Sequence, residues 1–202
     1  MSDLSVPIDV RGRTPYSIDQ FVIPNGSSDY IKEILISNGE IRDRVQKLRH
    51  EIADDYKDKE LFVFGVLQGA AKFMFSLFED FPYVYNHRLI EAKSYIGTKA
   101  GPVSIGKIDA NALKGKDVLI VEDIIDRGKT LDELLKKLNN FPKSIEICAL
   151  LDKPDTRIVD VDVKYTGFVI PDEFVIGFGL DYNNDFRYFP HIAVLKEEVY
   201  SK

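Results

Sequence analysis

The chain has 202 residues, 45% of them hydrophobic and 30% charged, a composition typical of one globular domain of roughly 100 to 200 residues. Its 27 lysines and arginines and 33 aspartates and glutamates give a formal net charge of −6. This charge argues against nucleic acid or an anionic membrane as a partner, because both select a basic surface.

The N-terminus is too polar for a signal peptide, and no apolar stretch approaches the ~18 residues that cross a bilayer, so we expect a cytoplasmic protein with no membrane partner. The predicted elements begin after an irregular lead, 1–37, in which 21–23 is a weak strand candidate. Apolar residues then recur at three- and four-residue spacing as far as Tyr56. This spacing predicts an amphipathic helix that is capped by Ser37 or Asn38.

Strands and helices alternate through the rest of the chain. The run 61–67 is apolar on both faces, as expected of a strand inside a parallel sheet, and a helix is predicted over 70–79. Further strands are predicted over 118–121, 145–151 and 161–169, with a helix over 130–138. The single cysteine, Cys148, lies in one of these apolar runs, so we expect a buried core thiol. The alternation predicts an α/β fold with right-handed crossovers, in which ligands bind at the carboxyl ends of the strands.

The richest polar cluster follows the predicted strand 118–121. Glu122 and Asp123 end the strand, and a short loop then opens a helix. Gly128 permits a turn that a β-carbon would prevent, and the free amides of the first helical turn, with the Thr130 hydroxyl, predict a phosphate cradle. The loop is not a nucleoside-triphosphate P-loop, because the required upstream glycine is absent. Acids beside a phosphate repel it unless they bind hydroxyl groups or act through a metal, so a ribose phosphate fits this segment.

The segment 118–130 closely resembles the phosphoribosyl pyrophosphate motif of the type I phosphoribosyltransferases, in their hypoxanthine-guanine branch. The resemblance implies a single domain over 1–202, with a central, mainly parallel sheet flanked by helices. The core is expected over about 38–165, and a small hood subdomain from about 1–37 and 166–202. In this motif, the residues that the resemblance assigns to phosphoribosyl pyrophosphate are Glu122, Asp123, Asp126, Arg127, Gly128, Lys129 and Thr130.

Two further segments resemble family loops that contact the pyrophosphate and cover the reacting centre. The segment 65–69 resembles the pyrophosphate loop, in which a non-proline cis peptide, here between Leu67 and Gln68, turns a backbone amide toward the pyrophosphate; Gly69 completes the loop. The segment that contains Ser94 and Tyr95 resembles the start of the catalytic loop. The resemblance implies that this Ser-Tyr pair closes over the site and excludes water.

The resemblance also assigns residues to the purine and the metal. Lys153, at the end of a strand, would read the purine: an ammonium is only a donor, so it selects a 6-oxo group and rejects a 6-amino group. Phe174 would stack on the purine, and the backbone of Val175 would read its edge. Asp181 is expected near the purine and as a magnesium ligand, with Glu122 and Asp123 as further candidates. Arg187 would clamp the pyrophosphate, and Arg157 is expected to be structural.

Three positions depart from the family's pattern. The family commonly has Lys where Gln68 stands, usually has Thr where Arg127 stands, and often has Arg near the subunit interface where Glu91 stands. One charge contact with phosphate is therefore in question at Gln68. The backbone amide of Arg127 can still bind the phosphate. The details of the subunit interface near Glu91 stay open.

The reaction implied by the resemblance is transfer of the 5-phosphoribosyl group from phosphoribosyl pyrophosphate to hypoxanthine or guanine, which gives IMP or GMP and pyrophosphate in purine salvage. We expect an oxocarbenium-like transition state, no protein nucleophile, Asp126 as general base, magnesium as cofactor, and a homodimer or homotetramer. One alternative is a 6-oxopurine phosphoribosyltransferase that also accepts xanthine. Another is a regulatory, nucleotide-sensing protein of the same fold, against which the net charge of −6 argues because such proteins need a basic face or an added DNA-binding domain.

Overall fold

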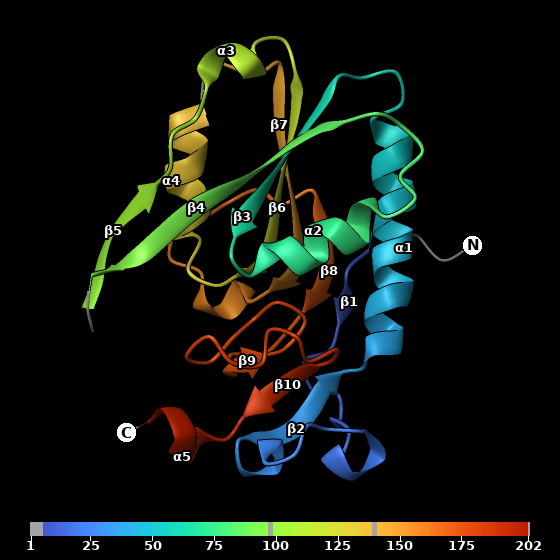
Figure 1. Cartoon of the computed structure of the whole chain (residues 1–202), viewed down its shortest axis with the longest axis vertical. Coiled ribbons are helices and arrows are strands. Elements are labelled where there is room, and N and C mark those ends of the chain that lie inside the picture. The colour runs from blue at the N-terminus through green and yellow to red at the C-terminus, as the bar shows by residue number, and fades with distance from the viewer. Residues whose placement is uncertain (1–5, 97–98, 139–140, 202) are drawn as a thin grey trace.

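The computed structural model describes residues 6–96, 99–138 and 141–201, without the side chains of 93–104 and 110. In this part of the chain, the backbone forms one seven-stranded and one three-stranded sheet (Figure 1). The strands of the large sheet, in chain order, are β1 (Ile8–Asp9), β3 (Leu61–Leu67), β4 (Asn86–Ile96), β5 (Lys99–Ile105), β6 (Asp117–Ile125), β7 (Ser144–Asp152) and β8 (Tyr165–Val169). Their order across the sheet is β1-β8-β7-β6-β3-β4-β5.

The large sheet is parallel except at β5, which pairs antiparallel with β4. Helices cover both faces, as the alternation of strands and helices predicts, and this confirms the α/β fold class. The helices on one face are α1 (Asn38–Asp55) and α2 (Ala70–Phe78), and those on the other are α3 (Ala110–Leu113) and α4 (Lys129–Leu138). No described helix is both long enough and apolar enough to cross a membrane.

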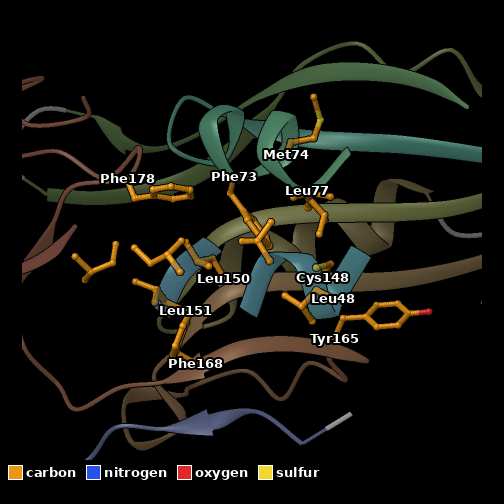
Figure 2. Packing of buried hydrophobic residues seen from close by; sticks show 14 of the residues in the cluster. Leu48, Phe73, Met74, Leu77, Cys148, Leu150, Leu151, Tyr165, Phe168 and Phe178 are labelled. Atoms are coloured by element: carbon orange, nitrogen blue, oxygen red, sulfur yellow. The ribbon is translucent and has the colours of Figure 1, made fainter. Parts of the chain in front are cut away.

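The side chains of the central strands alternate between two hydrophobic clusters. In β6, Leu119 and Val121 pack on the side of α1 and α2, whereas Val118 and Ile120 pack on the side of α4. This alternation follows from the two-residue period of a strand, and it explains why the central strands are apolar throughout. Figure 2 shows side chains of α1, α2, β7 and β8 in the first cluster, around Cys148. Cys148 is buried as predicted, and its burial raises the pKa of the thiol.

The helix α1 begins where the sequence places its cap. The Ser37 hydroxyl accepts a hydrogen bond from the Glu40 amide at 3.3 Å, and the Glu40 carboxylate accepts one from the Ser37 amide at 2.8 Å. This reciprocal pair is a capping box. Further along the helix, the buried Arg44 donates to the carbonyls of Thr166 and Gly167, which ties α1 to β8.

The small sheet has the order β2-β10-β9 and draws on both ends of the chain. Its strands are β2 (Ile31–Ile36), β9 (Val175–Ile176) and β10 (Ile192–Leu195), and the helix α5 (Glu197–Tyr200) follows β10. We call this sheet with its loops and α5 the hood. Figure 1 shows it below the large sheet, with α5 at its far end. The hood boundaries given above, 1–37 and 166–202, stay a prediction.

The structure corrects several sequence expectations at the edges of elements. The candidate 21–23 is not a strand; it lies between a 3-10 helix and Pro24. Its residues Phe21 and Ile23 pack on the hood, whereas Val22 is exposed. The lead 1–37 was expected to be irregular, yet it contains β1, which pairs with β8, and β2, which pairs with β10. These two pairings join residues more than 150 positions apart, and local patterns do not report such partners. The strand predicted over 161–169 begins only at Tyr165, and the strand predicted over 118–121 extends to 117–125.

Candidate active site

Three central strands bring the predicted site residues to one edge of the large sheet. The strands β7, β6 and β3 are neighbours and run parallel, so their carboxyl ends meet. The Lys153 amide, just after β7, donates to the carbonyl of Ile125 at the end of β6 at 2.9 Å. The loops after the strands therefore face a common region, which lies between the large sheet and the hood (Figure 1).

The loop between β6 and α4 has the backbone that a phosphate cradle requires. Gly128 has a φ of +81°, and a β-carbon there would come within 2.4 Å of the Val159 carbonyl oxygen. The amides of Ile158 and Val159 each donate to the Arg127 carbonyl at 3.1 Å, which anchors the loop to the segment that follows β7. The first amides of α4 have no intrahelical acceptor, so they can bind an anion. The side chains of Arg127 and Lys129 are exposed, and that of Thr130 is half-buried.

Glu122 and Asp123 form a buried acidic pair at the end of β6. Each is 8% exposed, and Oε2 of Glu122 has no hydrogen-bond partner among the described residues. Burial raises the pKa of the Glu122 carboxyl well above its usual range, and the neighbouring Asp123 raises it further. Burial also raises the pKa of Asp123, although Glu122, the Ile124 amide and Arg187 act in the opposite direction. The pair therefore retains a proton more readily than free carboxyl groups do. The buried Oε2 of Glu122 can accept a hydrogen bond from a hydroxyl group of a ligand.

The loop after β3 closes tightly on this acidic pair. The peptide bond between Leu67 and Gln68 is cis, as the resemblance implied. A β-carbon at Gly69 would lie 1.5 Å from Oδ2 of Asp123, so only glycine leaves room for that carboxylate. From the hood, Gly179, with a φ of +109°, crosses so closely that a β-carbon there would lie 2.2 Å from the Gly69 carbonyl oxygen. The loop after β3 is thus packed between the Asp123 carboxylate on β6 and the hood backbone at Gly179.

Asp181 and Arg187, both of which the resemblance assigned to the site, contact each other. Arg187 Nη2 lies 2.7 Å from Asp181 Oδ1, and Arg187 Nη1 donates to the Gly179 carbonyl at 2.8 Å. The other carboxylate oxygen of Asp181 accepts from the Asn184 amide at 2.8 Å. Both oxygens of Asp181 are therefore bound by protein donors, and the positive guanidinium also acts electrostatically on Asp123 of the acidic pair.

The residues assigned to the base lie where the hood meets β7. Lys153 is 7% exposed, and its ammonium donates to the Glu173 carbonyl at 2.7 Å and pairs with Asp172 at 3.5 Å. Val175 is buried in β9. Phe174 remains 37% exposed. An exposed aromatic ring beside a buried ammonium is an arrangement that can hold a flat, polar ring.

Sequence reasoning missed the residue that supports Phe174. The ring of Tyr200, at the end of α5, stacks on Phe174 with centroids 5.0 Å apart, and Tyr182 contacts Phe174 edge-on at 5.9 Å. The Tyr182 hydroxyl also donates to the Val199 carbonyl at 2.8 Å, which holds α5 in place. No local pattern around Tyr200 indicates this role, because the contact exists only after the hood has assembled.

The Asp126 side chain, just beyond β6, is exposed and accepts a hydrogen bond from the Thr156 hydroxyl, a contact that the sequence did not indicate. Arg157 pairs with Asp152, in keeping with its expected structural role. Ser94 and Tyr95 lie on β4, but their side chains are outside the described residues.

Residues 33–183 match the phosphoribosyl transferase domain family. The chain belongs to this family. It is 40% identical over 174 residues to a hypoxanthine-guanine phosphoribosyltransferase of Lactococcus lactis, which covers 85% of this chain and 95% of that protein. A protein of the same name from Staphylococcus epidermidis is 39% identical over 175 residues, or 85% of this chain and 98% of that protein. A crystal structure of a hypoxanthine phosphoribosyltransferase from Staphylococcus aureus superposes with a TM-score of 0.83 at 37% identity, over 90% of this chain and 100% of that one.

The donor atoms of this phosphoribosyltransferase suit a divalent cation that is shared with substrate. Magnesium prefers carboxylate oxygens and usually keeps other ligands from water or phosphate. Among the described residues, no three His, Cys, Asp or Glu side chains cluster as a complete metal site. Glu122 nevertheless has a buried oxygen that meets no hydrogen-bond partner in the described part of the chain, beside the Asp123 carboxylate. Glu122 and Asp123 could therefore supply part of a coordination shell that the substrate completes. Asp181 could join them once its ion pair with Arg187 is broken.

Proposed function

We propose that this phosphoribosyltransferase transfers the 5-phosphoribosyl group of phosphoribosyl pyrophosphate to hypoxanthine or guanine and releases pyrophosphate. The product is IMP or GMP, so the role is purine salvage. The proposal rests on one observation: the Gly128 loop, Lys153 and Phe174 come together at one edge of the large sheet. The names of the relatives that match most of this chain support the same activity.

In this proposal, the sugar phosphate lies over the carboxyl end of β6. The 5′-phosphate binds the amides of the Gly128 loop and of the first turn of α4, where the helix dipole favours an anion. The vicinal hydroxyls of the ribose donate to Glu122 and Asp123. This accounts for two buried carboxyl groups that would otherwise be costly to keep.

The pyrophosphate is proposed to lie between the loop after β3 and the hood. Backbone amides near Gln68 and Gly69 face it, and Arg187 supplies a guanidinium once it leaves Asp181. Because Gln68 is neutral where the family commonly has Lys, we assign more of the charge neutralisation to Arg187 and to magnesium. When bound, magnesium would neutralise negative charge on the leaving pyrophosphate. Asp181, Glu122 and Asp123 are the residues proposed to hold it.

The base is proposed to stack on Phe174 with its 6-oxo group toward Lys153. The ammonium offers only donors, so an adenine amino group there would be left without an acceptor. The backbone of Val175 would read the opposite edge of the base. Acceptance of xanthine remains the second candidate within this activity, since it depends on the same backbone near Val175 and Asp181.

Asp126 is proposed to act as the general base on the purine. It follows the ribose-binding acids on the same strand end, and its carboxylate is exposed, with one oxygen bound by Thr156 and the other proposed to face the imidazole ring of the base. General catalysis of this kind contributes about 100- to 10,000-fold. Ser94 and Tyr95 are proposed to close over the site and exclude water, which would otherwise compete for the oxocarbenium-like sugar.

We also propose a cytoplasmic location and a homodimer or homotetramer. The buried, unpaired Cys148 fits a reducing compartment. On α2 and the loop that follows it, Phe75 is 53% exposed and Val84 is 94% exposed. Contiguous apolar patches mark subunit contacts, and we propose that these two side chains belong to one. Sedimentation at several concentrations would measure the subunit number.

A purine panel tests the proposed activity. Protein, magnesium and phosphoribosyl pyrophosphate are incubated with hypoxanthine, guanine, xanthine or adenine, and nucleotide formation is followed by chromatography. We expect IMP and GMP to form rapidly and AMP to be absent or slow. Formation of AMP at the rate of IMP, or of no nucleotide from any base, would contradict the proposal. Rapid XMP formation would favour the xanthine-accepting variant.

A further inference from the structure

We propose that Thr156 is a positioning residue for the transfer reaction: its hydroxyl holds the Asp126 carboxylate in the orientation that faces the base. This inference rests on the proposed function, in which Asp126 is the general base. It concerns a residue that neither the sequence pattern nor the relatives' names assign to the reaction.

The contact joins two strand ends. Thr156 lies in the 3-10 turn Pro154–Thr156, which follows β7, whereas Asp126 lies just after β6. The Thr156 hydroxyl donates to Oδ1 of Asp126 and lies 3.1 Å from the Lys153 carbonyl oxygen. The Thr156 amide donates to the same Lys153 carbonyl at 3.2 Å. One residue therefore connects the proposed general base to the turn that carries the proposed 6-oxo reader.

The chemistry of the contact determines what it can do. A threonine hydroxyl has one proton, and both oxygens near it, those of Asp126 and of the Lys153 carbonyl, only accept. The charged carboxylate is the stronger acceptor, so the proton is donated to Asp126. The Lys153 carbonyl still receives the amide proton of Thr156. With Oδ1 held, the second oxygen of Asp126 is left to accept from the imidazole ring of the purine. An exposed aspartate without such a contact would rotate among several rotamers.

The turn itself has other anchors, so loss of the hydroxyl need not unfold it. Arg157 pairs with Asp152, and the Arg157 amide donates to the Pro154 carbonyl at 3.2 Å. On the outer side, Arg11 pairs with Asp155 at 3.3 Å, which ties the N-terminal lead to the turn. Because these contacts hold the turn without the Thr156 hydroxyl, a variant at Thr156 can test its effect on Asp126 while the turn stays folded.

The test compares Thr156→Val with Thr156→Ser. Valine keeps the shape and loses the hydroxyl, whereas serine keeps the hydroxyl and loses a methyl group. For Thr156→Val we expect kcat with hypoxanthine to fall about 10- to 100-fold, the range that a hydrogen bond to a charged group supports, with little change in the KM for phosphoribosyl pyrophosphate. Thr156→Ser should stay within about 3-fold of the wild type. Asp155→Asn, which weakens only the exposed pair with Arg11, is the matched control and should stay near the wild-type rate.

A double variant tests whether Thr156 acts through Asp126. If it does, Asp126→Asn with Thr156→Val should be no slower than Asp126→Asn alone. Equal losses in the valine and serine variants, an unchanged kcat in Thr156→Val, or a double variant slowed by the product of both effects would overturn the inference. Melting temperatures measured in parallel show whether the valine variant is folded at the assay temperature; if it is not, the serine variant and the double variant at a lower temperature decide. Failure of the proposed function is a separate result, since the wild type would then form no IMP.

Discussion

Replacement of Glu122 by Gln should stabilise the ligand-free protein at neutral and alkaline pH. Glu122 is 8% exposed, one of its oxygens has no partner among the described residues, and Asp123 lies beside it. Burial and the neighbouring acid raise the pKa of Glu122. A glutamine at this position cannot ionise, and its amide can donate to the Asp123 carboxylate. The variant thus keeps the shape of the side chain and removes the electrostatic penalty.

The size and the pH dependence of the effect follow from the burial. A buried polar group without a partner costs about 1–3 kcal/mol, and each kcal/mol shifts the Tm of a chain of this length by about 2–4 °C. We therefore expect a Tm increase on the order of 5 °C at pH 8. Below about pH 4.3, the usual pKa of glutamate, both folded and unfolded wild type hold the proton and the advantage vanishes. As the pH rises, the unfolded glutamate ionises first, so wild-type stability falls until the pH passes the raised folded pKa.

Thermal unfolding at about pH 3.5, below the usual pKa of glutamate, and at pH 8, in the absence of phosphoribosyl pyrophosphate, measures this difference. Glu133→Gln is a suitable control, because Glu133 lies on the surface of α4 and pairs only with Lys136 among the described contacts; its Tm should change little at either pH. A Glu122→Gln variant that is less stable than the wild type at pH 8, or equally stabilised at both pH values, would refute the electrostatic reasoning. In the same variant, phosphoribosyl pyrophosphate should bind more weakly, since a carboxylate acceptor for the ribose is lost.

Three further changes test other parts of the site. Gly69→Ala should weaken phosphoribosyl pyrophosphate binding more than about 10-fold, because the new methyl group displaces a carboxylate that lies 1.5 Å from its position. The matched control is Gly39→Ala in α1, where a β-carbon would lie 3.9 Å from the Ser37 hydroxyl oxygen; this variant should bind normally and gain about 0.5–1 kcal/mol of stability. Tyr200→Ala should raise the KM for hypoxanthine about 2- to 10-fold through the loss of the stack that supports Phe174, and Tyr200→Phe should restore it. Lys153→Gln should reduce the preference for hypoxanthine over adenine about 10-fold or more, because an amide offers an acceptor as well as a donor.

Each of these changes has an outcome that contradicts it. Normal binding in Gly69→Ala would mean that the loop after β3 does not pack on the acidic pair as described. A lower KM in Tyr200→Ala would mean that the tyrosine competes with the base instead of supporting Phe174. Full selectivity in Lys153→Gln, measured as the ratio of kcat/KM for the two bases, would show that another group reads position 6.

The elements that the sequence predicted well are those whose signal is local. The apolar runs of β3 and β7 and the spacing in α1 result from burial on a sheet and along a helix face, so they are visible in a few consecutive residues. The positive φ of Gly128 and the carboxyl-end position of Glu122 were also accessible, because a glycine in a strand-to-helix loop and acids at a strand end have recognisable chemistry. The resemblance added the cis peptide after Leu67.

The parts that were missed depend on partners far away in the chain. The strand β2 is stabilised by β10, and β1 by β8, and neither partner could be read from the local sequence. Thr156 and Tyr200 are likewise ordinary residues until folding brings them to Asp126 and Phe174. The pairing of Asp181 with Arg187 could not be foreseen either, although both residues had been singled out, because the tight turn between them sets their geometry.

Asp126→Asn gives the most direct test of the central claim, that this sheet edge performs glycosyl transfer to a purine with Asp126 as its base. The turnover of hypoxanthine and the Kd of phosphoribosyl pyrophosphate are measured on the same preparation. The account predicts that turnover falls about 100-fold or more while the Kd changes less than about 3-fold, since the ribose and phosphate contacts remain. Equal losses in turnover and in binding, or an unchanged turnover, would contradict it.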